Sequence, residues 1–339
     1  MTLLGLESSC DETSVSIIRD GKILSNLISS QLFHLKYGGV VPELSSRAHL
    51  QIITPLFKKA LDEANISKEE IDVVSATAGP GLIGALLVGL NFGKALSYSL
   101  EKPFIAVNHI EGHIFSGFLM DDKPKFPILT LVVSGGHTLL LLVKDDLNVV
   151  KLGTTIDDAA GEAFDKVAKM IGLGYPGGQK VQECSKNGNP NAINFPIANL
   201  KGAYDFSFSG LKTSVLRYIQ KEYINIDNIA ENEKSNIAAS FQNAVVKALQ
   251  INVEKAISNF DVNTLSLVGG VAANKALRNK FVLLAKKHNK KLVIPDIEFC
   301  GDNAAMIAYR AGKLFENNII SDLNAVAFPA LPKNVFISL

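Results

Sequence analysis

The feature that most constrains the fold is a strand–loop–strand–turn–strand plan that occurs twice along the chain. The first copy has predicted strands at residues 3–6, 15–18 and 23–28, a polar loop at 7–13 and the turn Asp20-Gly21. The second has predicted strands at 128–133, 139–143 and 149–152, with a polar loop at 134–138. Asp-Gly between apolar runs is a strong hairpin signal. Two halves that each open with hairpins predict an α/β protein of two similar lobes, each a mixed sheet flanked by helices, with a cleft between them.

The segments between the hairpins have the period of helices. Apolar residues three and four apart predict helices at 49–64, 157–171, 237–257 and 304–315, and a further helix begins near Lys275. Short apolar runs predict more strands at 73–76, 103–107, 265–268 and 292–294. A membrane-spanning helix needs ~20 apolar residues. Gly79-Pro80-Gly81 divides the longest uncharged stretch into a strand and a helix, so we expect a soluble protein without a membrane anchor.

Length and charge limit the classes of function. With 339 residues, 47% of them hydrophobic, the chain is long enough for two domains with a sizeable core. The net charge of +1 excludes a general basic field, so any nucleic-acid binding has to use local patches or partners. Three scattered cysteines are typical of a reducing compartment, and charges at Asp11 and Glu12 interrupt any signal peptide. We expect a cytoplasmic protein.

A pair of histidines, His109 and His113, stands four residues apart after a predicted strand. In a helix capped by Asn108, this spacing places both rings on one face, ~40° apart. One face with two imidazoles suits a metal ion, but two ligands leave a metal site incomplete. The pair therefore needs a third group, unless both rings are structural. Zinc peptidases place a glutamate directly after the first histidine, whereas Glu111 lies two residues on and points away, so we set peptidase aside.

Glycine-bearing turns are the second candidate binding feature. They lie at Ser134-Gly135-Gly136, Pro176-Gly177-Gly178 and Gly269-Gly270, which we place at strand ends in the second lobe. Such turns let backbone N–H groups approach a phosphate, and a following helix adds favourable partial charge. A single glycine at such a junction is usually needed only for the backbone conformation of the turn. Three together favour a nucleotide-like ligand, although neither a Walker motif nor a dinucleotide fingerprint is present.

Seven motifs together closely resemble the bacterial tRNA N6-adenosine threonylcarbamoyltransferase family, in that family's order and spacing from the first strand to the last helix. They are Glu7-Ser8-Ser9-Cys10-Asp11-Glu12-Thr13, Val107-Asn108-His109-Ile110-Glu111-Gly112-His113, Val133-Ser134-Gly135-Gly136-His137-Thr138, Asp157-Asp158-Ala159-Ala160-Gly161-Glu162-Ala163-Phe164-Asp165-Lys166, Tyr175-Pro176-Gly177-Gly178, Gly269-Gly270-Val271-Ala272-Ala273-Asn274 and Asp302-Asn303-Ala304-Ala305-Met306. The resemblance implies a two-lobed actin-like ATPase fold. We place the first lobe at residues 1–125, the second at 126–310, and a C-terminal segment at 311–339 that packs back on the first.

The resemblance also implies the reaction and its residues. A threonylcarbamoyl group would pass from threonylcarbamoyl-AMP to N6 of the adenosine beside the anticodon, position 37, in tRNAs that read codons starting with A, and AMP would leave. His109, His113 and Asp302 would bind one metal ion, iron by family resemblance, with zinc as the alternative. The adenylate would lie along Val132, Val133, Ser134, Gly135 and Gly136, with Asp165 and Gly178 at the ribose and Asn274 near the base. Gln179 stands where the family commonly has proline.

Catalysis and partners complete these expectations. The amine's proton requires a base, and Asp11 and Glu12 on the first hairpin loop are candidates, or else residues of a solvated turn. The implied partners are tRNA, a paralogous subunit and a small ATPase. Helix faces at 52–61 and 86–90 would pair with that subunit, unless they are core. A basic run from Lys275 to Lys291 would contact RNA, or form a solvated face. The other readings are a small-molecule kinase of the same fold and a non-catalytic scaffold.

Overall fold

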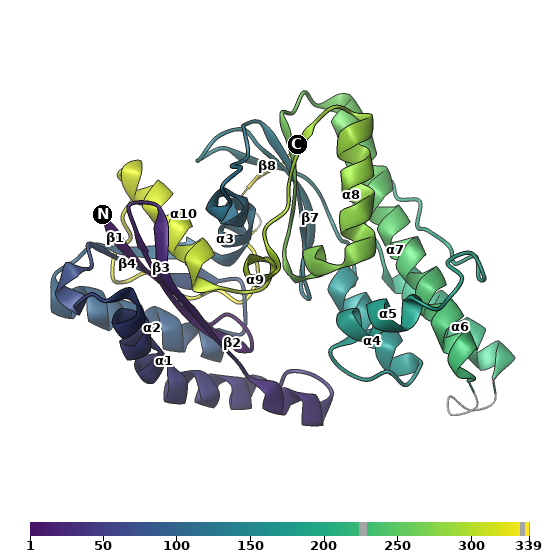
Figure 1. The fold of residues 1–339 in the computed structure, drawn as a ribbon, viewed down its shortest axis with the longest axis horizontal. Helices are drawn as coiled ribbons and strands as arrows, with labels where there is room; N and C mark the ends of the chain where they lie inside the picture. Colours follow the sequence, from purple (N-terminus) through teal and green to yellow (C-terminus); the bar gives the residue numbers. More distant parts are fainter. Residues whose placement is uncertain (224–228, 333–335, 339) are drawn as a thin grey trace. The chain divides into compact units, whose positions relative to one another are not determined.

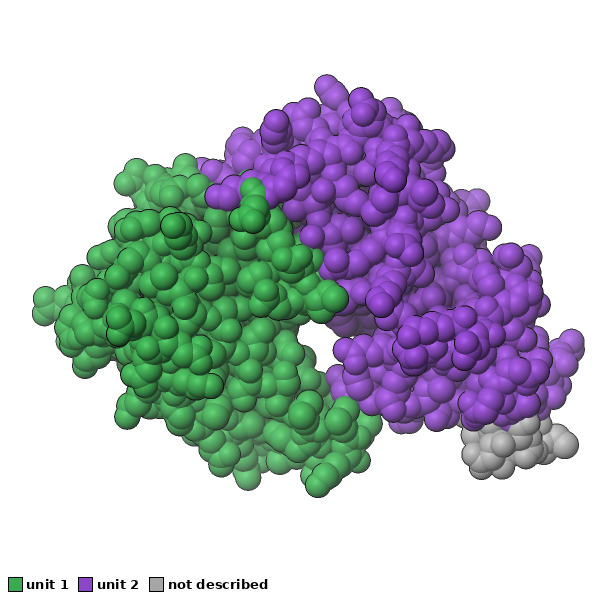
Figure 2. All heavy atoms as spheres, in the orientation of Figure 1, with its two compact units in different colours: residues 1–121, 295–335 green, residues 122–294, 336–339 purple. Residues whose placement is uncertain are grey.

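The structure is a computed structural model that describes residues 1–223, 229–332 and 336–338 (Figure 1). The chain divides into two compact units, drawn green and purple in Figure 2. Unit 1 comprises residues 1–121 and 295–335, and unit 2 comprises residues 122–294 and 336–339. Each unit is a mixed sheet flanked by helices, which confirms the predicted fold class.

Unit 1 is built on a five-stranded sheet in the order β3-β2-β1-β4-β5. Its strands are β1 (Thr2–Glu7), β2 (Glu12–Arg19), β3 (Lys22–Ser30), β4 (Val73–Gly79) and β5 (Phe104–Asn108). The first three strands pair antiparallel, as the hairpin signals predict, and β4 and β5 add parallel to β1. All six residues of β1 are buried, because this central strand has helices on both faces.

Alternation along β1 assigns the helices to the two faces. Leu4 and Leu6 pack in one core cluster with residues of α1 (Pro42–Ala64) and α2 (Ile83–Leu100). Leu3 packs in the other cluster with α10 (Ala304–Glu316). Gly5 also faces α10, where an added Cβ would lie 2.2 Å from a backbone oxygen of that helix. The α10 helix therefore lies directly on β1, and this close approach fixes the residues that precede α10.

Helix α2 is long and apolar enough to cross a membrane, as judged by length and composition alone. It follows β4 after the predicted Gly79-Pro80-Gly81 break and packs on β4 and α1. Leu86 and Leu90 are buried in this packing, as are Ile53, Leu56 and Phe57 of α1. The helix faces at 52–61 and 86–90 are therefore mainly core rather than free surfaces for a partner.

The predicted boundary at residue 310 falls inside α10 and is wrong. Because α10 packs on the first sheet, the change of unit lies at residues 294/295, before α9 (Ile297–Cys300). The chain after α10 also bonds to unit 1: Phe328 N–H donates to the Ala78 carbonyl at 2.9 Å, and Ser321 N–H donates to that of Phe104 at 2.9 Å. Of the predicted C-terminal segment, residues 333–335 and 339 lie outside the described residues.

Unit 2 repeats the hairpin plan in a six-stranded sheet of order β10-β9-β6-β7-β8-β11. Its strands are β6 (Ile128–Val133), β7 (Thr138–Val143), β8 (Val149–Thr154), β9 (Thr264–Val268), β10 (Lys291–Val293) and β11 (Ile337–Ser338). Its helices are α4 (Ala160–Met170), α5 (Gly177–Ser185), α6 (Ser209–Glu222), α7 (Glu231–Asn259) and α8 (Lys275–Lys287). The turn at Pro176 joins α4 to α5, so its predicted place at a strand end is wrong.

One largely buried ion pair joins α10 to α3 (His109–Phe115), the helix that carries the histidine pair. Arg310 Nε donates to Glu111 Oε2 at 2.7 Å, and the guanidinium lies 4.3 Å from the centre of the Phe115 ring. The two charged side chains are only 4% and 18% exposed. Glu111 therefore faces α10 and not the histidines, which agrees with setting the peptidase reading aside.

We expect Arg310→Met to lower the free energy of unfolding by about 3–5 kcal/mol, because it leaves the largely buried Glu111 carboxylate without its cation. Urea unfolding measures this loss. Arg47→Met is the matched control, since Arg47 pairs with Glu43 at 2.6 Å where both side chains are more than 70% exposed. The control should change stability by less than about 1 kcal/mol. Equal losses in the two variants would contradict the assigned role of the buried pair.

Candidate functional site

The histidine pair is positioned by the start of α3, as the sequence predicts. Asn108 ends β5, and its side chain accepts hydrogen bonds from Ile110 N–H at 2.8 Å and Glu111 N–H at 3.3 Å. This cap starts the helix at His109, so His109 and His113 lie one turn apart on the same side. Both rings are buried, and their centres are 4.7 Å apart.

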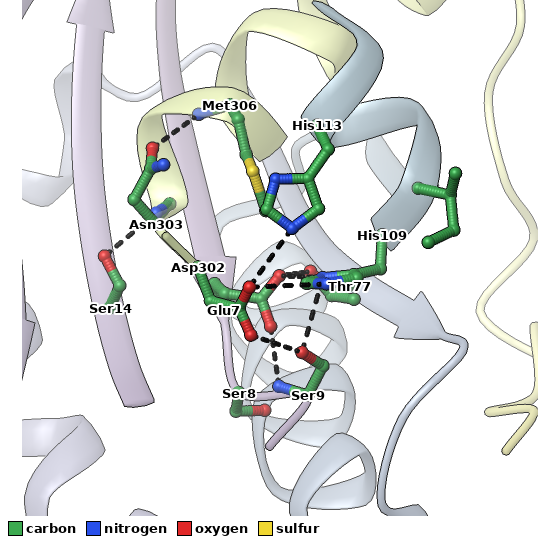
Figure 3. Close-up of polar contacts among 12 residues, drawn as sticks. Glu7, Ser8, Ser9, Ser14, Thr77, His109, His113, Asp302, Asn303 and Met306 are labelled. Carbon is green, nitrogen blue, oxygen red and sulfur yellow. Dashed lines mark hydrogen bonds and ion pairs between the residues drawn. The ribbon is translucent and has the colours of Figure 1, made fainter. Parts of the chain in front are cut away.

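Asp302 is the third member of the cluster, and it comes from the segment before α10 (Figure 3). Asn303 caps α10 by accepting from Met306 N–H at 3.0 Å, and Ser14 of β2 accepts from Ala304 N–H at 2.9 Å. These bonds fix the backbone on both sides of the junction. Asp302 Oδ1 consequently lies 3.1 Å from His113 Nε2 and 3.5 Å from His109 Nε2.

These distances fit a single metal ion. Ligands about 2.1 Å from a metal lie about 3.0–3.4 Å from each other at octahedral or tetrahedral angles. The donor atoms of His109, His113 and Asp302 all lie within 4.8 Å of one another. Two imidazoles and one carboxylate supply only three ligands, which leaves further coordination positions of a metal ion open. The residues predicted as metal ligands are therefore together in unit 1.

The electrostatics of the cluster also favour a cation. Burial lowers the pKa of His109, but the carboxylates of Asp302 and Glu7 outweigh burial and raise it to about 9. Burial raises the pKa of Asp302, and the two histidines outweigh that effect and hold it well below its usual range. The carboxylates beside the buried His109 therefore favour positive charge at this position, which suits a cation.

Glu7 was missed as a site residue by the sequence analysis, which included it only within a motif. Its Oε2 lies 3.0 Å from His109 Nδ1, and its side chain is fully buried. A carboxylate can only accept, so Nδ1 carries the proton and Nε2 is left for the metal. Ser9 N–H and the Thr77 hydroxyl each donate to Glu7 at 2.6 Å. The Glu at the end of β1 is a signal that could have indicated this role.

We expect Glu7→Gln to weaken metal binding by roughly 10- to 100-fold while the protein stays folded, because the amide cannot fix the His109 tautomer as a carboxylate does. Metal titration followed by calorimetry measures the affinity. Thr77→Val is the matched variant, since it removes one donor from Glu7 but leaves the carboxylate on His109, and its effect should be smaller. An unchanged affinity in Glu7→Gln would show that this contact does not orient the ligand.

The two candidate bases lie in the loop beside this cluster. Asp11 ends the loop after β1, and Glu12 is the first residue of β2; both side chains are part-exposed. Ser30 Oγ donates to Glu12 Oε1 at 3.1 Å. Burial, followed by the negative charge of Asp302, raises the pKa of Glu12 to about 8. The pKa of the Cys10 thiol is also raised, mainly by burial and then by Asp11.

Unit 2 contains a cavity of about 200 Å³ between the predicted nucleotide loops. Its lining includes four of the predicted binding residues, Gly135, Asp165, Gly178 and Asn274. Ser134 closes the β6–β7 turn by donating its N–H to the His137 carbonyl at 2.8 Å, and Gly136 is exposed in that turn. Val132 and Val133 are fully buried in β6, so their side chains cannot reach a ligand.

Close backbone approaches shape this cavity. An added Cβ on Gly161, at the start of α4, would lie 2.5 Å from the Ser134 carbonyl oxygen. Gly269 has φ +94°, and an added Cβ there would lie 2.5 Å from the Val133 oxygen. Asp165 Oδ1 accepts from Gly177 N–H at 2.7 Å, which ties α5 to α4. The N-termini of α4 and α5 therefore both border the cavity, an arrangement that favours an anionic group.

Asn274 lines the cavity, but its side chain is occupied. Its Oδ1 caps α8 by accepting from Leu277 N–H at 3.1 Å, and its Nδ2 donates to Gln242 Oε1 at 2.8 Å. The Asn274 side chain is therefore fixed by bonds within the protein. Its predicted place near the adenine base is supported by its position in the cavity lining, and not by a hydrogen-bond donor that a base could use. Gln179, the departure from the family pattern, is exposed at the cavity rim.

The basic run at 275–291 is partly neutralised. Lys287 pairs with Glu254, Lys290 with Asp261 at 3.5 Å, and Lys291 with Asp122. Arg278 Nε donates to the Ala272 carbonyl at 2.7 Å. These pairs favour the solvated-face alternative for the second half of the run, and contact with RNA remains a prediction.

The fold and the cluster define an actin-like ATPase-fold protein with a two-histidine, one-carboxylate metal-type site. The HypF of T. kodakarensis superposes with a TM-score of 0.67 at 14% identity, covering 94% of this chain and 49% of that one. An activator of 2-hydroxyisocaproyl-CoA dehydratase from Clostridium difficile, with bound ADPNP, superposes with a TM-score of 0.51 at 14% identity, covering 95% and 99%. At this identity the likeness establishes the fold alone.

Sequence relatives identify the family. The model of the tRNA N6-adenosine threonylcarbamoyltransferase family matches residues 22–309. The enzyme of that name from Thermosipho africanus is 54% identical over 333 residues, which cover 98% of this chain and 99% of the relative. That from Kosmotoga olearia is 50% identical over 333 residues, with 98% of each covered. The chain therefore belongs to the tRNA N6-adenosine threonylcarbamoyltransferase family, enzymes that threonylcarbamoylate adenosine in tRNA.

Proposed function

We propose that the donor is threonylcarbamoyl-AMP and that the acceptor is N6 of adenosine 37, beside the anticodon, in tRNAs that read codons starting with A. AMP is the second product. The observation that carries this proposal is the preformed cluster of His109, His113 and Asp302, which a nucleotide-hydrolysing relative of the same fold would not need. The family membership and the glycine-lined cavity of unit 2 support the adenylate part of the donor.

The adenylate would bind in unit 2. The exposed turn Ser134-Gly135-Gly136 and the N-terminus of α4 offer backbone N–H groups to the phosphate. Asp165 and Gly178 would contact the ribose hydroxyls, because a carboxylate accepts from a diol and the open space over Gly178 admits the sugar. The lining by Phe164 and Pro176 gives the base an apolar surface. Asn274 would lie beside the base without forming a hydrogen bond to it.

His109, His113 and Asp302 would hold one metal ion in unit 1, and the orientation of His109 by Glu7 would strengthen the site. When bound, the metal supplies Lewis-acid polarisation of donor oxygens and a template for orientation. Two histidines and one carboxylate with open positions are typical of iron, so we propose iron, with zinc as the alternative.

Glu12 is the better candidate for the proton acceptor. The donor is already activated, so the protein mainly has to orient a weakly nucleophilic amine and accept its proton. A carboxyl with a pKa of about 8 exchanges its proton near neutral pH. Asp11, its neighbour in the loop, would add negative charge that favours a cationic partner.

The enzyme would act in the cytoplasm with a paralogous subunit and a small ATPase. Because the helix faces at 52–61 and 86–90 are mainly core, a subunit that docks on α1 and α2 would instead contact their exposed apolar side chains. These are Leu50, Ile83 and Leu87, which are 69%, 47% and 43% exposed. Docking would cover apolar surface that water otherwise contacts.

Product analysis separates this proposal from the kinase and scaffold readings. The reconstituted enzyme with threonylcarbamoyl-AMP and unmodified tRNA should release AMP in proportion to the tRNA added. A kinase of this fold would instead turn over ATP with a small hydroxylated substrate and bind no metal at the cluster. A scaffold would release no AMP. AMP release that does not depend on tRNA would contradict the proposed acceptor.

A further inference from the structure

The loop between β1 and β2 is held through its backbone. Three consecutive carbonyls accept hydrogen bonds from three different elements: Ser9 O from Leu82 N–H at 2.8 Å, Cys10 O from His49 Nε2 at 3.0 Å and from Ser45 Oγ, and Asp11 O from Gln31 N–H at 3.0 Å. The donors belong to the N-cap of α2, to α1 and to the residue that follows β3. The backbone of this loop is thus fixed, while the side chains of Asp11 and Glu12 remain part-exposed.

His49 has one possible arrangement of its proton. Its ring is fully buried, and burial lowers its pKa, so it is neutral. The Cys10 carbonyl can only accept, so Nε2 carries the hydrogen and donates it. Nδ1 is therefore an acceptor, and the Thr13 hydroxyl donates to it at 2.7 Å. The ring is held from one side by β2 and delivers its single N–H to the loop.

A second buried histidine continues the network. Val41 N–H donates to His34 Nδ1 at 3.2 Å, so Nε2 carries the hydrogen and donates to Gln31 Oε1 at 2.9 Å. The Gln31 amide nitrogen then donates to the Ser45 carbonyl at 3.3 Å. Every bond thus runs in a defined direction toward the loop or toward the residues that hold it.

This network is costly for a purely structural purpose. Burying two imidazoles, an amide and two hydroxyls removes them from water, and apolar side chains of similar size would fill the space without that desolvation. Its bonds end on the carbonyls of Cys10 and Asp11, next to Ser9, whose hydroxyl lies 3.4 Å from Asp302 Oδ2. What the network fixes is the position of the loop carboxylates beside the metal-type cluster.

We propose that His49 and Ser45 are positioning residues for threonylcarbamoyl transfer: their two hydrogen bonds to the Cys10 carbonyl hold the loop that presents Asp11 and Glu12. The inference rests on the proposed function, because it assumes that these carboxylates act on the amine. His49 and Ser45 are both fully buried and bond to the Cys10 carbonyl, so they would act through the loop backbone. Misplacement of a reacting group by about 1 Å can cost as much as 100-fold in rate.

His49→Asn and His49→Gln form the decisive pair. Glutamine places its amide nitrogen as many bonds from Cα as Nε2, so it can still donate to the Cys10 carbonyl. The asparagine nitrogen corresponds to Nδ1 and stops short of that carbonyl. We expect kcat of His49→Asn to fall ~10-fold with KM for tRNA and bound metal near their wild-type values, and His49→Gln to recover at least about a third of wild-type kcat.

Ser45→Ala and Ser25→Ala form a matched second pair. Ser25 Oγ of β3 donates to the Ala60 carbonyl of α1 at 2.9 Å, so each serine makes one side-chain hydrogen bond that joins α1 to another segment, but only Ser45 bonds to the loop. Both variants should lose a similar few degrees of Tm. Only Ser45→Ala should lose kcat, again ~10-fold, with metal content unchanged.

The outcomes separate the inference from the function on which it rests. If Ser45→Ala loses no more kcat than Ser25→Ala, or if His49→Gln is as slow as His49→Asn, the positioning role is wrong. If His49→Asn does not fold, the serine pair decides the question alone. If the wild-type enzyme transfers no threonylcarbamoyl group under the same conditions, the proposed function itself has failed, irrespective of these variants.

Discussion

Replacing His113 with alanine is expected to remove the bound metal and to lower the rate of threonylcarbamoyl transfer by at least ~100-fold. His113 Nε2 lies 3.1 Å from Asp302 Oδ1 in a fully buried position, so no water-exposed side chain can replace it. Loss of one of the three proposed ligands would leave two donors, too few to hold a metal against water. Asp302→Ala should behave alike, although it lies 189 residues away in sequence. Metal analysis of the purified variants measures the first effect, and AMP release the second.

His288→Ala is the matched control for these variants. His288 caps the end of α8 in unit 2, where its Nε2 lies 3.4 Å from Glu254 Oε1, whereas all three members of the cluster belong to unit 1. Its removal should leave both metal content and transfer near wild type. Full metal occupancy in His113→Ala and Asp302→Ala would show that the metal binds elsewhere.

Gly161→Ala is expected to weaken adenylate binding by roughly 10- to 100-fold, the second large effect. The new Cβ would lie 2.5 Å from the Ser134 carbonyl oxygen and 2.8 Å from the Gly135 Cα, both backbone atoms. Either the turn or the start of α4 has to move, and overpacking of this kind typically costs 1–3 kcal/mol. Because both elements border the cavity, the displacement changes the backbone that would contact the phosphate. Calorimetric titration with AMP measures the affinity.

Gly210→Ala provides the control for that prediction. Gly210 also lies in the first turn of a helix of unit 2, α6, but an added Cβ there meets nothing within 4 Å. AMP affinity should therefore be unchanged, and the helix should gain slightly from alanine. If Gly161→Ala bound AMP as tightly as Gly210→Ala, the cavity between α4, α5 and the β6–β7 turn would not be the adenylate site.

Local signals in the sequence predicted most elements of the fold. The Asp20-Gly21 turn and the Asn108 cap act within a few residues, so the hairpin and the start of α3 could be located. Helix α1 begins at Pro42 rather than at residue 49, because its first turns lack the apolar period. The turn at Pro176 and the boundary at 294/295 depend on packing between distant segments. Such contacts leave no periodic signal in the chain.

The candidate site was predictable to a similar degree. The spacing of His109 and His113 indicated a metal pair, but the third ligand, Asp302, came from the family resemblance rather than from spacing. Glu7 was missed because its role depends on β1 ending beside α3, a long-range contact. Asn274 was assigned to the base, yet its side chain caps α8 and bonds to Gln242. A residue's type does not show which of its hydrogen bonds the protein already uses.

The most direct test of the account is mass spectrometry of tRNA nucleosides after reconstitution. Unmodified tRNA is incubated with the enzyme, its partner proteins and threonylcarbamoyl-AMP, then digested to nucleosides and, in parallel, to oligonucleotides that locate the modification. We expect N6-threonylcarbamoyladenosine only at position 37 of tRNAs reading codons that start with A, and almost none with His113→Ala. Transfer that proceeds at the wild-type rate in His113→Ala, or no modified adenosine with the complete wild-type system, would contradict it.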